Sequence, residues 1–362
     1  MAGSLEEAGR RLLTRLTAWM LPAREEVRFD WTAAEPERVL FVRHDDRIGN
    51  LVLLTPLLQG ARTIWPGAEI GVLIGPRYAA LYSEQPFVDR LWVLEKRRIL
   101  RNPLRFFRLV REVRAHDYQI AFDCSHMHSF SLTGAALTHF SAAPLRVAYE
   151  RGQAGDFANL LIEPLHAEHH ESDILLNLLR PFTEQLPSPP MRLHTTKEDR
   201  WRAELRFTTS DIPEDAVVMG MHVGGRGAKR WPLTRWLGVL QRVTELFQLQ
   251  VAVFCGPDEA DAAEQLLGPS ERGITVFREL DLQELTAAIQ RCDAFLAPDT
   301  GPMHMAVALD VPTVAVFLED TWRRYGPRGS MHRIVRADPE GGEDEVVAAL
   351  SEILRERFGG SS

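Results

Sequence analysis

Short apolar runs alternate with longer stretches of helical periodicity along this chain, and that alternation is what most limits its fold. Four runs lie in the first half and four in the second, at 39–46, 68–75, 89–95, 117–125, 217–223, 250–256, 294–299 and 312–317. Runs of this length are typical of buried strands, and helical stretches between them favour a parallel sheet with helices on both faces. The sequence therefore predicts an α/β fold of Rossmann-like architecture.

A proline-rich segment at 186–191 divides this pattern in two, because clustered prolines cannot continue a helix or a central strand. The length of 362 residues also favours two domains. We expect Rossmann-like domains at 38–186 and 187–340, then a closing helix at 344–358 and a flexible tail within 341–362. Residues 1–37 would form an N-terminal extension. Its residues 5–21 predict an amphipathic helix that docks on the body of the protein, or alternatively lies on a membrane surface.

Charge and cysteine content narrow the class of protein further. The chain carries 42 Lys and Arg against 50 Asp and Glu, and this formal charge of −8 argues against bulk electrostatic binding of nucleic acid. The three cysteines stand far apart in apolar surroundings, without a CxxC pair, which indicates buried thiols in a reducing cytoplasm. There is no apolar run long enough for a membrane span and no signal-peptide pattern, so we expect a protein that is neither secreted nor integral.

The segment 294–317 carries the most informative motif. An apolar strand ends at Asp299, and Thr300, Gly301 and Pro302 open a helix whose first amides lack helical partners. These amides and the positive end of the helix dipole predict a site for a diphosphate. Asp299 would orient a sugar or ribose hydroxyl, and His304 would donate to a phosphate oxygen. An ordinary capped turn between strand and helix is the alternative.

A glycine-rich loop within 220–236 provides a second motif. It follows a strand and offers three cations, Arg226, Lys229 and Arg230, before the next helix begins. Neither a Walker P-loop nor a GxGxxG fingerprint is present. Together with the turn at Thr300, the loop indicates a nucleotide-diphosphate site in which side chains neutralise the charge of the leaving group.

Residues 95–114 contain eight basic residues and resemble one amphipathic helix. On a helical projection Arg101, Arg105 and Arg108 share one side, and the apolar residues 106, 109, 110 and 113 share the other. This strip would face an anionic glycolipid acceptor or an anionic membrane surface, and an exposed solubilising face is the alternative. The histidines at 126, 128, 166, 169 and 170 lack the spacing of known metal motifs, so we expect no metal site.

Three segments of the sequence together resemble glycosyltransferase family 9, the ADP-heptose:lipopolysaccharide heptosyltransferase family. They are VLFVRHDDRIGNLVLLTPLL, KRWPLTRW and DTGPMHMAVALDVPTVAVF, and the resemblance spans about residues 38–355. It implies the GT-B fold, in which two Rossmann-like domains face one another across a cleft. It also implies sugar transfer with inversion and without an obligatory metal cofactor.

The resemblance assigns roles to particular residues. Lys229 would contact the diphosphate of the donor, the turn at 300–302 would hold its phosphates, and Asp299 would hold its sugar. Either Asp258 or Glu259, after the strand 250–256, would bind the ribose. Either His169 or His170 would help to place a ligand, and His170 is the one expected to bind the acceptor.

One departure from the family pattern concerns the catalytic base. The family commonly has R-I-G-D at the first turn, whereas this chain has Asn50 in the last position. A neutral amide cannot accept the proton of the acceptor hydroxyl. Asp46, or in second place Asp45, would then act as base, or the site is slow or altered. A solvated strand end is the alternative for this acidic pair.

The sequence as a whole predicts a cytoplasmic GT-B glycosyltransferase at the inner face of the inner membrane. It would transfer a heptose from ADP-heptose to a lipopolysaccharide core or related glycan acceptor, with inversion. Two alternatives remain: a catalytically silent protein that binds sugar nucleotides, favoured by Asn50, and a nucleotide-dependent oxidoreductase, disfavoured by the missing glycine fingerprint.

Overall fold

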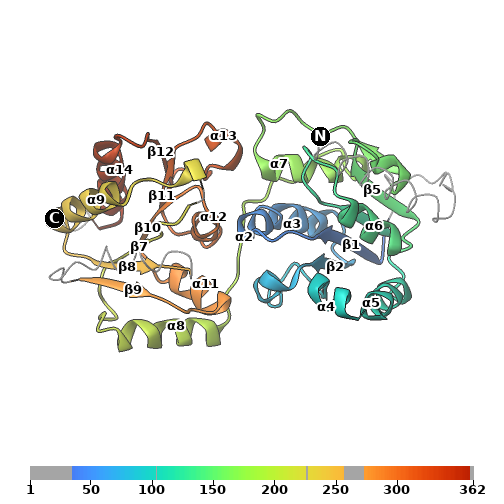
Figure 1. The fold of residues 1–362 in the computed structure, drawn as a ribbon, viewed down its shortest axis with the longest axis horizontal. Helices are drawn as coiled ribbons and strands as arrows, with labels where there is room; N and C mark the ends of the chain where they lie inside the picture. The colour runs from blue at the N-terminus through green and yellow to red at the C-terminus, as the bar shows by residue number, and fades with distance from the viewer. Residues whose placement is uncertain (1–34, 103, 226, 257–272, 359–362) are drawn as a thin grey trace. The chain divides into compact units, whose positions relative to one another are not determined.

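The computed structural model describes residues 35–102, 104–225, 227–256 and 273–358. The predicted helix at 5–21, Arg226, Asp258 and Glu259 lie outside the described residues. The chain forms two compact units (Figure 1). Unit 1 comprises Met1–Asp46, Pro56–His166 and Ser172–Pro189, and unit 2 comprises Arg47–Thr55, Ala167–Glu171 and Pro190–Ser362. The chain passes from unit 1 to the main part of unit 2 at Pro189–Pro190, within the proline-rich segment. Two short earlier segments, Arg47–Thr55 and Ala167–Glu171, also belong to unit 2.

Unit 1 is built on a six-stranded parallel sheet in the order β3-β2-β1-β4-β5-β6. Its strands are β1 (Arg38–Arg43), β2 (Glu69–Ile74), β3 (Arg90–Val93), β4 (Ile120–Asp123), β5 (Leu145–Tyr149) and β6 (Leu160–Ile162). Its helices are most of α3 (Thr55–Ile64), α4 (Lys96–Arg101), α5 (Leu104–Ala115), α6 (Leu132–Phe140), most of α7 (Glu171–Leu176) and three 3-10 segments, η2 (Pro76–Leu81), η3 (Ala154–Asp156) and η4 (Asn177–Phe182).

Alternate residues of the unit 1 strands face opposite layers of helices. Leu40 and Val42 of β1 belong to a buried cluster that also contains residues of α5 and α6. Phe41, between them, stacks on Phe122 with ring centroids 4.8 Å apart. Phe122 also contacts the rings of Trp65, which follows α3, and Phe182, the last residue of η4. Both faces of the sheet are therefore covered, as the continuous apolar runs predict.

Unit 2 repeats this plan with a six-stranded parallel sheet in the order β12-β11-β10-β7-β8-β9. Its strands are β7 (Val218–Met221), β8 (Gln250–Phe254), β9 (Ile274–Phe277), β10 (Ala294–Pro298), β11 (Thr313–Phe317) and β12 (Arg333–Arg336). Its helices are α2 (Ile48–Val52), α8 (Lys197–Thr209), α9 (Leu233–Leu246), α11 (Leu282–Gln290), α12 (Gly301–Ala308), α13 (Trp322–Tyr325), α14 (Glu343–Phe358) and the 3-10 turn η5 (Gly227–Lys229).

The core of unit 2 lies on the two faces of this sheet. On one face, Trp236 of α9 and Leu350 of α14 are fully buried against β7, β8, β10 and β11. On the other face, α8 packs on α11 and α11 contacts α12 (Figure 1). The predicted closing helix at 344–358 is confirmed as α14, and the predicted α/β architecture is confirmed in both units.

Two stretches whose periodicity predicts one continuous helix each, 50–65 and 95–114, are interrupted in the structure. The stretch after Gly49 divides into α2 and α3 just before Pro56, and the stretch 95–114 divides into α4 and α5 at Asn102. Asn102 adopts an extended conformation with φ −147° and ψ 90° because a residue that precedes proline avoids the helical region. The prediction that Arg101 shares one helix with Arg105 and Arg108 is therefore wrong.

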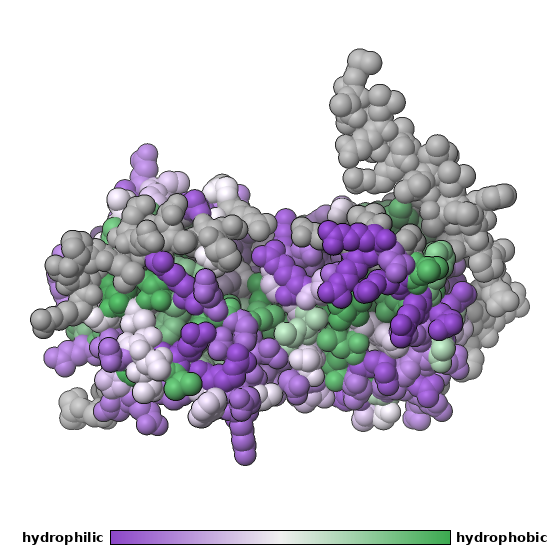
Figure 2. Space-filling model, turned by 60° about the horizontal axis from the view of Figure 1, so that its bottom comes forward, coloured by the Kyte–Doolittle hydropathy of each residue, from purple (hydrophilic) through white to green (hydrophobic). Residues whose placement is uncertain are grey.

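Surface and thiol positions complete the description. On the face drawn in Figure 2, hydrophobic side chains reach the surface in small areas among hydrophilic ones. In the part of the chain that the structure describes, no helix combines the length and apolar character that a membrane crossing needs. Cys124 and Cys292 are buried as predicted, whereas Cys255 is only half-buried.

Candidate functional site

Each sheet has one point at which the chain order reverses, and the candidate site residues gather beside these points. In unit 2, β7 leads outward to β8 and β9 on one side, and β10 pairs with β7 on the other side. Loops that follow two such strands diverge at their carboxyl ends, which is where open α/β sheets bind ligands. The loop after β7 carries Lys229, and the loop after β10 carries Asp299.

Lys229 and Asp299 form the centre of the unit 2 site. The Lys229 ammonium donates a hydrogen bond to Asp299 Oδ2, and Thr321 Oγ1 donates to the same oxygen at 3.2 Å. The Asp299 side chain is 7% exposed and that of Lys229 is 32% exposed. An ammonium has three N–H donors, so Lys229 can bond Asp299 and still present donors to a bound anion. Sequence reasoning singled out both residues but gave them separate roles, and the structure joins them.

The start of α12 supplies backbone donors next to this pair. Thr300 is the N-cap residue in an extended conformation, and its side chain makes no capping hydrogen bond to the helix. The Thr300 hydroxyl instead donates to the carbonyl of Pro298 at 3.2 Å. The amides at the opening of α12 therefore do not depend on that hydroxyl, and with the helix dipole they favour an anion.

His304, in the first turn of α12, is buried and uncharged at neutral pH. The pKa of His304 is lowered to about 4, mainly by burial; Asp299 opposes the shift, and the charge of Lys229 adds to it. The Nε2 atom lies 3.9 Å from Asp299 Oδ1. Among the described residues, nothing lies in hydrogen-bond range of the buried Nδ1 atom. A neutral imidazole keeps one N–H, so the predicted role of His304 as a hydrogen-bond donor is compatible with its environment.

Helix α2 packs directly on α12, a contact that sequence reasoning missed. A Cβ atom at Gly49 would lie 2.8 Å from His304 Cδ2, and one at Gly301 would overlap the side chain of Ile48. Two glycines are thus required for the approach of these helices. Asn50 is buried on α2 and so lies in the unit that carries the candidate diphosphate site. The glycines in R-I-G-N and T-G-P were the available signal.

A buried ion pair supports the loop after β11. Glu171 Oε2 accepts from Arg324 Nε at 2.9 Å and from Arg324 NH2 at 2.5 Å, and the Glu171 side chain is 1% exposed. The neighbouring His170 is also buried, with Nε2 3.1 Å from the carbonyl of Gly326. His170, predicted to bind the acceptor, therefore contacts the backbone beside α13. His169 precedes it in the same short segment of unit 2.

The glycine-rich loop after β7 folds tightly before Lys229. A Cβ at Gly225 would lie 2.7 Å from the carbonyl oxygen of Lys229, and Gly227 has a positive φ of 57°. Both positions favour glycine, so the loop can turn sharply just before Lys229. Arg230 follows the turn as an exposed residue.

The reversal point of the unit 1 sheet lies between β1 and β4 and carries the acidic pair. Arg43, at the end of β1, is 1% exposed and donates to the carbonyl of Cys124 and, at 3.2 Å, to Asp45 Oδ2. His126 Nε2 lies 3.2 Å from the same Asp45 oxygen. Asp45 is therefore held between two side chains, whereas Asp46 is exposed.

A second buried pair continues this edge of the unit 1 sheet. Asp123 Oδ1 accepts from the Ser125 hydroxyl at 2.5 Å and from the Ser125 amide at 3.0 Å, and Arg151 NH2 donates to Asp123 Oδ2 at 3.3 Å. A Cβ at Gly134 would overlap Ser125 and Asp123, so α6 begins in close contact with this pair. The sequence did not single out Asp123 or Arg151, because these two residues lie 28 positions apart and nothing local shows that they bond.

Among the described residues, no hydrogen bond or ion pair joins a basic residue of 95–114 to the Lys229–Asp299 pair or to Asp45 and Asp123. Arg101 lies on α4 and Arg105 and Arg108 on α5, all of them exposed. Arg108 pairs with Glu112 at 2.8 Å one helical turn away. Within the described ranges, no three His, Cys, Asp or Glu side chains are grouped as metal ligands.

Comparison with known proteins gives one family and several relatives. Residues 106–351 match the family described as glycosyltransferase family 9 (heptosyltransferase). The chain is 22% identical over 284 residues to lipopolysaccharide heptosyltransferase 3 of Escherichia coli, a match that covers 74% of this chain and 79% of the relative.

Two solved structures share the fold. A glycosyl transferase family 9 protein from Veillonella parvula superposes with a TM-score of 0.81 at 20% identity, over 90% of this chain and 99% of that one. The E. coli heptosyltransferase WaaC with ADP superposes with a TM-score of 0.70 at 19% identity, over 88% of this chain and 99% of that one. The predicted GT-B fold class is confirmed by these similarities.

Proposed function

The chain belongs to glycosyltransferase family 9, and from that premise we propose that it transfers a heptose from ADP-heptose to a lipopolysaccharide core or related glycan, with inversion. The observation that carries this proposal is the Lys229–Asp299 pair beside the opening of α12. A paired ammonium and a helix N-terminus, both at the reversal point of one sheet, suit a diphosphate that gains charge as it leaves. The E. coli relative solved with ADP supports the choice of an adenine nucleotide.

In the proposed reaction the acceptor hydroxyl attacks the anomeric carbon of the donor from the face opposite the diphosphate. The new carbon–oxygen bond forms as the bond to the phosphate oxygen breaks, and ADP departs with the electron pair. Lys229 and the α12 amides stabilise the departing charge, with His304 as a neutral donor. We propose that these groups suffice without a metal cofactor.

Asp46 is the proposed base that takes the proton of the acceptor hydroxyl. Asp45 is ion-paired with the buried Arg43 and lies beside His126, whereas the next residue, Asp46, is exposed. An ion-paired carboxylate is a weaker base than an exposed one, since the cation favours its ionised form. Asn50, buried on α2, would take no part in proton transfer.

The testing experiment measures heptose transfer and ADP-heptose binding in parallel. Asp46→Asn is expected to lower kcat by about 10²- to 10⁴-fold, the usual contribution of a general base, with little change in donor affinity. Asp45→Asn is the matched control and should affect folding stability more than kcat. If Asp46→Asn leaves kcat unchanged, the base assignment is wrong.

A catalytically silent sugar-nucleotide-binding protein is the second candidate, and Asn50 is the observation that favours it. The same experiment separates the two: the silent protein would bind ADP-heptose without transfer to any glycan acceptor, irrespective of Asp45 and Asp46. Protection against thermal unfolding by ADP, compared with UDP and NAD, reports the nucleotide preference by mass action. A stronger effect of NAD would revive the oxidoreductase alternative.

We also propose that the acceptor is an anionic glycolipid and that the enzyme works at the cytoplasmic face of the inner membrane. A lipid-linked acceptor confines the reaction to a membrane surface, and this supports peripheral binding. Cell fractionation that finds the protein in membrane pellets, released by high salt, would agree with this location.

A further inference from the structure

Helices α4 and α5 carry an exposed surface that no step of the reaction proposed above involves. Its apolar members are Leu104, 74% exposed, and Phe107, 66% exposed, which lie one turn apart on α5. Single exposed apolar residues are ordinary, but these two lie side by side, on the side of α5 opposite to Val113, which is packed in the unit 1 core. Helix α5 therefore has two apolar sides: one is packed on unit 1, and the other, with Leu104 and Phe107, faces solvent.

Arginines surround these two side chains. At 100° per residue, Arg108 and Arg111 lie on the same side of α5 as Leu104 and Phe107, and Arg105 lies at its border. All three arginines are exposed, as are Lys96 and Arg101 of the preceding helix, and of the three on α5 Arg108 is paired with Glu112 at 2.8 Å. Residues 95–114 contain eight basic and two acidic residues in a chain whose net charge is −8. The positive charge of this surface is thus local and opposes the balance of the whole chain.

We infer that this surface, defined as Leu104, Phe107 and the exposed basic residues 96, 101, 105, 108 and 111, binds the headgroup region of an anionic phospholipid membrane. Charge complementarity selects the occupant: arginines attract anionic lipids, and a leucine and a phenylalanine between them can enter the acyl boundary. The inference deepens the proposed function by naming the membrane-binding surface, and it does not depend on the identity of the donor or the base.

The chain offers a matched control on α8 in unit 2. Trp201 is 61% exposed and Leu205 is 49% exposed, also one turn apart. The neighbouring Arg202 pairs with Asp281 at 2.5 Å, and Arg206 pairs with Glu284 at 3.5 Å. This surface is apolar without an excess of positive charge, so it should not distinguish anionic from neutral lipid.

The test is cosedimentation of the full chain with vesicles, without donor or acceptor. Vesicles of phosphatidylglycerol and phosphatidylethanolamine are compared with vesicles of phosphatidylcholine alone. We expect binding to the anionic vesicles only, weakened by salt. Arg105→Gln with Arg111→Gln should lower the partition coefficient by about fivefold for each charge removed. Leu104→Ser with Phe107→Ser should lower it by about tenfold or more, and Trp201→Ser with Leu205→Ser should leave it unchanged.

Several outcomes would overturn the inference. Equal binding to both kinds of vesicle, or variants of α5 that bind as the unchanged chain does, would show that this surface does not contact lipid. If the α5 variants instead raise KM for a water-soluble phosphorylated glycan and leave vesicle binding intact, the surface belongs to the acceptor site. If the unchanged chain shows no transferase activity, the proposed function is contradicted, but the vesicle result still tests the membrane-binding surface. Circular dichroism and thermal unfolding confirm that each variant is folded.

Discussion

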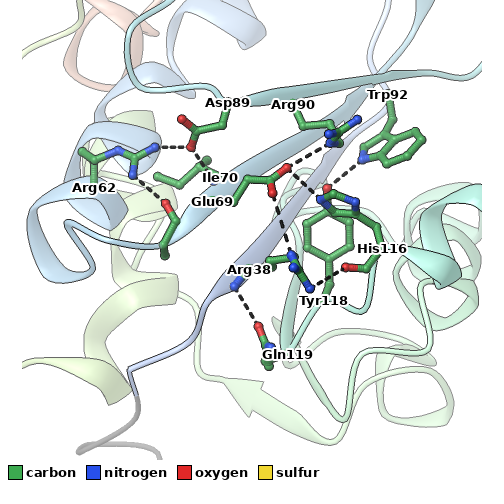
Figure 3. A network of polar contacts seen from close by, with 11 residues as sticks. Arg38, Arg62, Glu69, Ile70, Asp89, Arg90, Trp92, His116, Tyr118 and Gln119 are labelled. Atoms are coloured by element: carbon green, nitrogen blue, oxygen red, sulfur yellow. Dashed lines mark hydrogen bonds and ion pairs between the residues drawn. The ribbon is translucent and has the colours of Figure 1, made fainter.

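Each unit holds a network of ionisable side chains, and the two networks lie at opposite ends of the strands of their sheets. In unit 1, Glu69 at the start of β2 accepts from Arg90 Nε at 2.9 Å and lies 2.7 Å from His116 Nε2 (Figure 3). Beside them, Trp92 Nε1 donates to Tyr118 Oη at 2.7 Å. This network lies at the amino ends of the strands, and its partners come largely from the strands themselves.

The network in unit 2 lies at the carboxyl ends of the strands, on loops and on the start of α12. Lys229 has donors beyond its bond to Asp299, and His304 has a buried ring nitrogen that no described group contacts. In unit 2 the unused donors lie beside the amides that open α12, at the strand ends where α/β sheets bind ligands. Ion-paired residues therefore indicate a candidate site where their position and their remaining donors coincide.

Removal of the Lys229 ammonium should have the largest effect on the unit 2 network. Lys229→Met is expected to lower kcat/KM for heptose transfer by about 10²- to 10³-fold, comparable to the loss of one donor to a developing oxyanion. The affinity for ADP, measured by calorimetry, should fall as well. Lys229→Arg keeps the charge and should retain part of the activity. An Asp299-paired lysine with a purely structural role would change thermal stability without changing ADP affinity.

The burial of His304 predicts a pH dependence of stability. Its pKa is lowered to about 4 in the folded state and has its ordinary value near 6.5 in the unfolded chain. The unfolded state therefore binds the proton first, and the free energy of unfolding falls as pH drops from about 6.5 to 4, by up to about 3 kcal/mol. His304→Gln should weaken this dependence, measured by urea unfolding at several pH values. A slope that is identical in both proteins would contradict the burial of a neutral histidine.

The parts of the fold predicted from sequence are those with a local cause. Eight strands and the turn at Thr300 follow from apolar periodicity and from a proline at a helix start. The strands β5, β6, β9 and β12 were not predicted, although other strands of four or five residues were. The breaks before Pro56 and at Asn102 had a visible signal in the prolines, which the helical periodicity outweighed.

The missing parts of the site depend on contacts between distant residues. Lys229 and Asp299 are 70 positions apart, and nothing local in either segment shows that they bond. The packing of Gly49 against His304 likewise requires α2 to join unit 2, which the order of the chain does not suggest. Residue types and strand ends could thus be predicted, but not which groups are bonded to one another.

A larger side chain next to the unit 1 network should lower the free energy of unfolding and leave catalysis unchanged. A Cβ at Gly71 would overlap the Tyr118 hydroxyl, which is buried and bonded to Trp92. Gly71→Ala is therefore expected to lower the free energy of unfolding by about 1–3 kcal/mol. Gly67→Ala, where a Cβ meets nothing within 4 Å, is the control. Equal stability of the two variants would show that Tyr118 yields readily.

The smallest expected effect concerns the charge of Glu69. Although partial burial by itself raises the pKa of Glu69, the hydrogen bonds from Arg90 and His116 outweigh it and lower the pKa below its ordinary value. The ionised form is thus favoured in the folded state, so its stabilisation is present above about pH 4.5 and is lost as pH falls through the lowered folded-state pKa. Glu69→Gln should cost about 1 kcal/mol at pH 7 and less at pH 3, measured by urea unfolding. A cost that is independent of pH would mean that shape rather than charge holds this network. Heptose transfer per folded molecule should not change in either case, because the network lies at the amino ends of the strands and the candidate site residues follow their carboxyl ends.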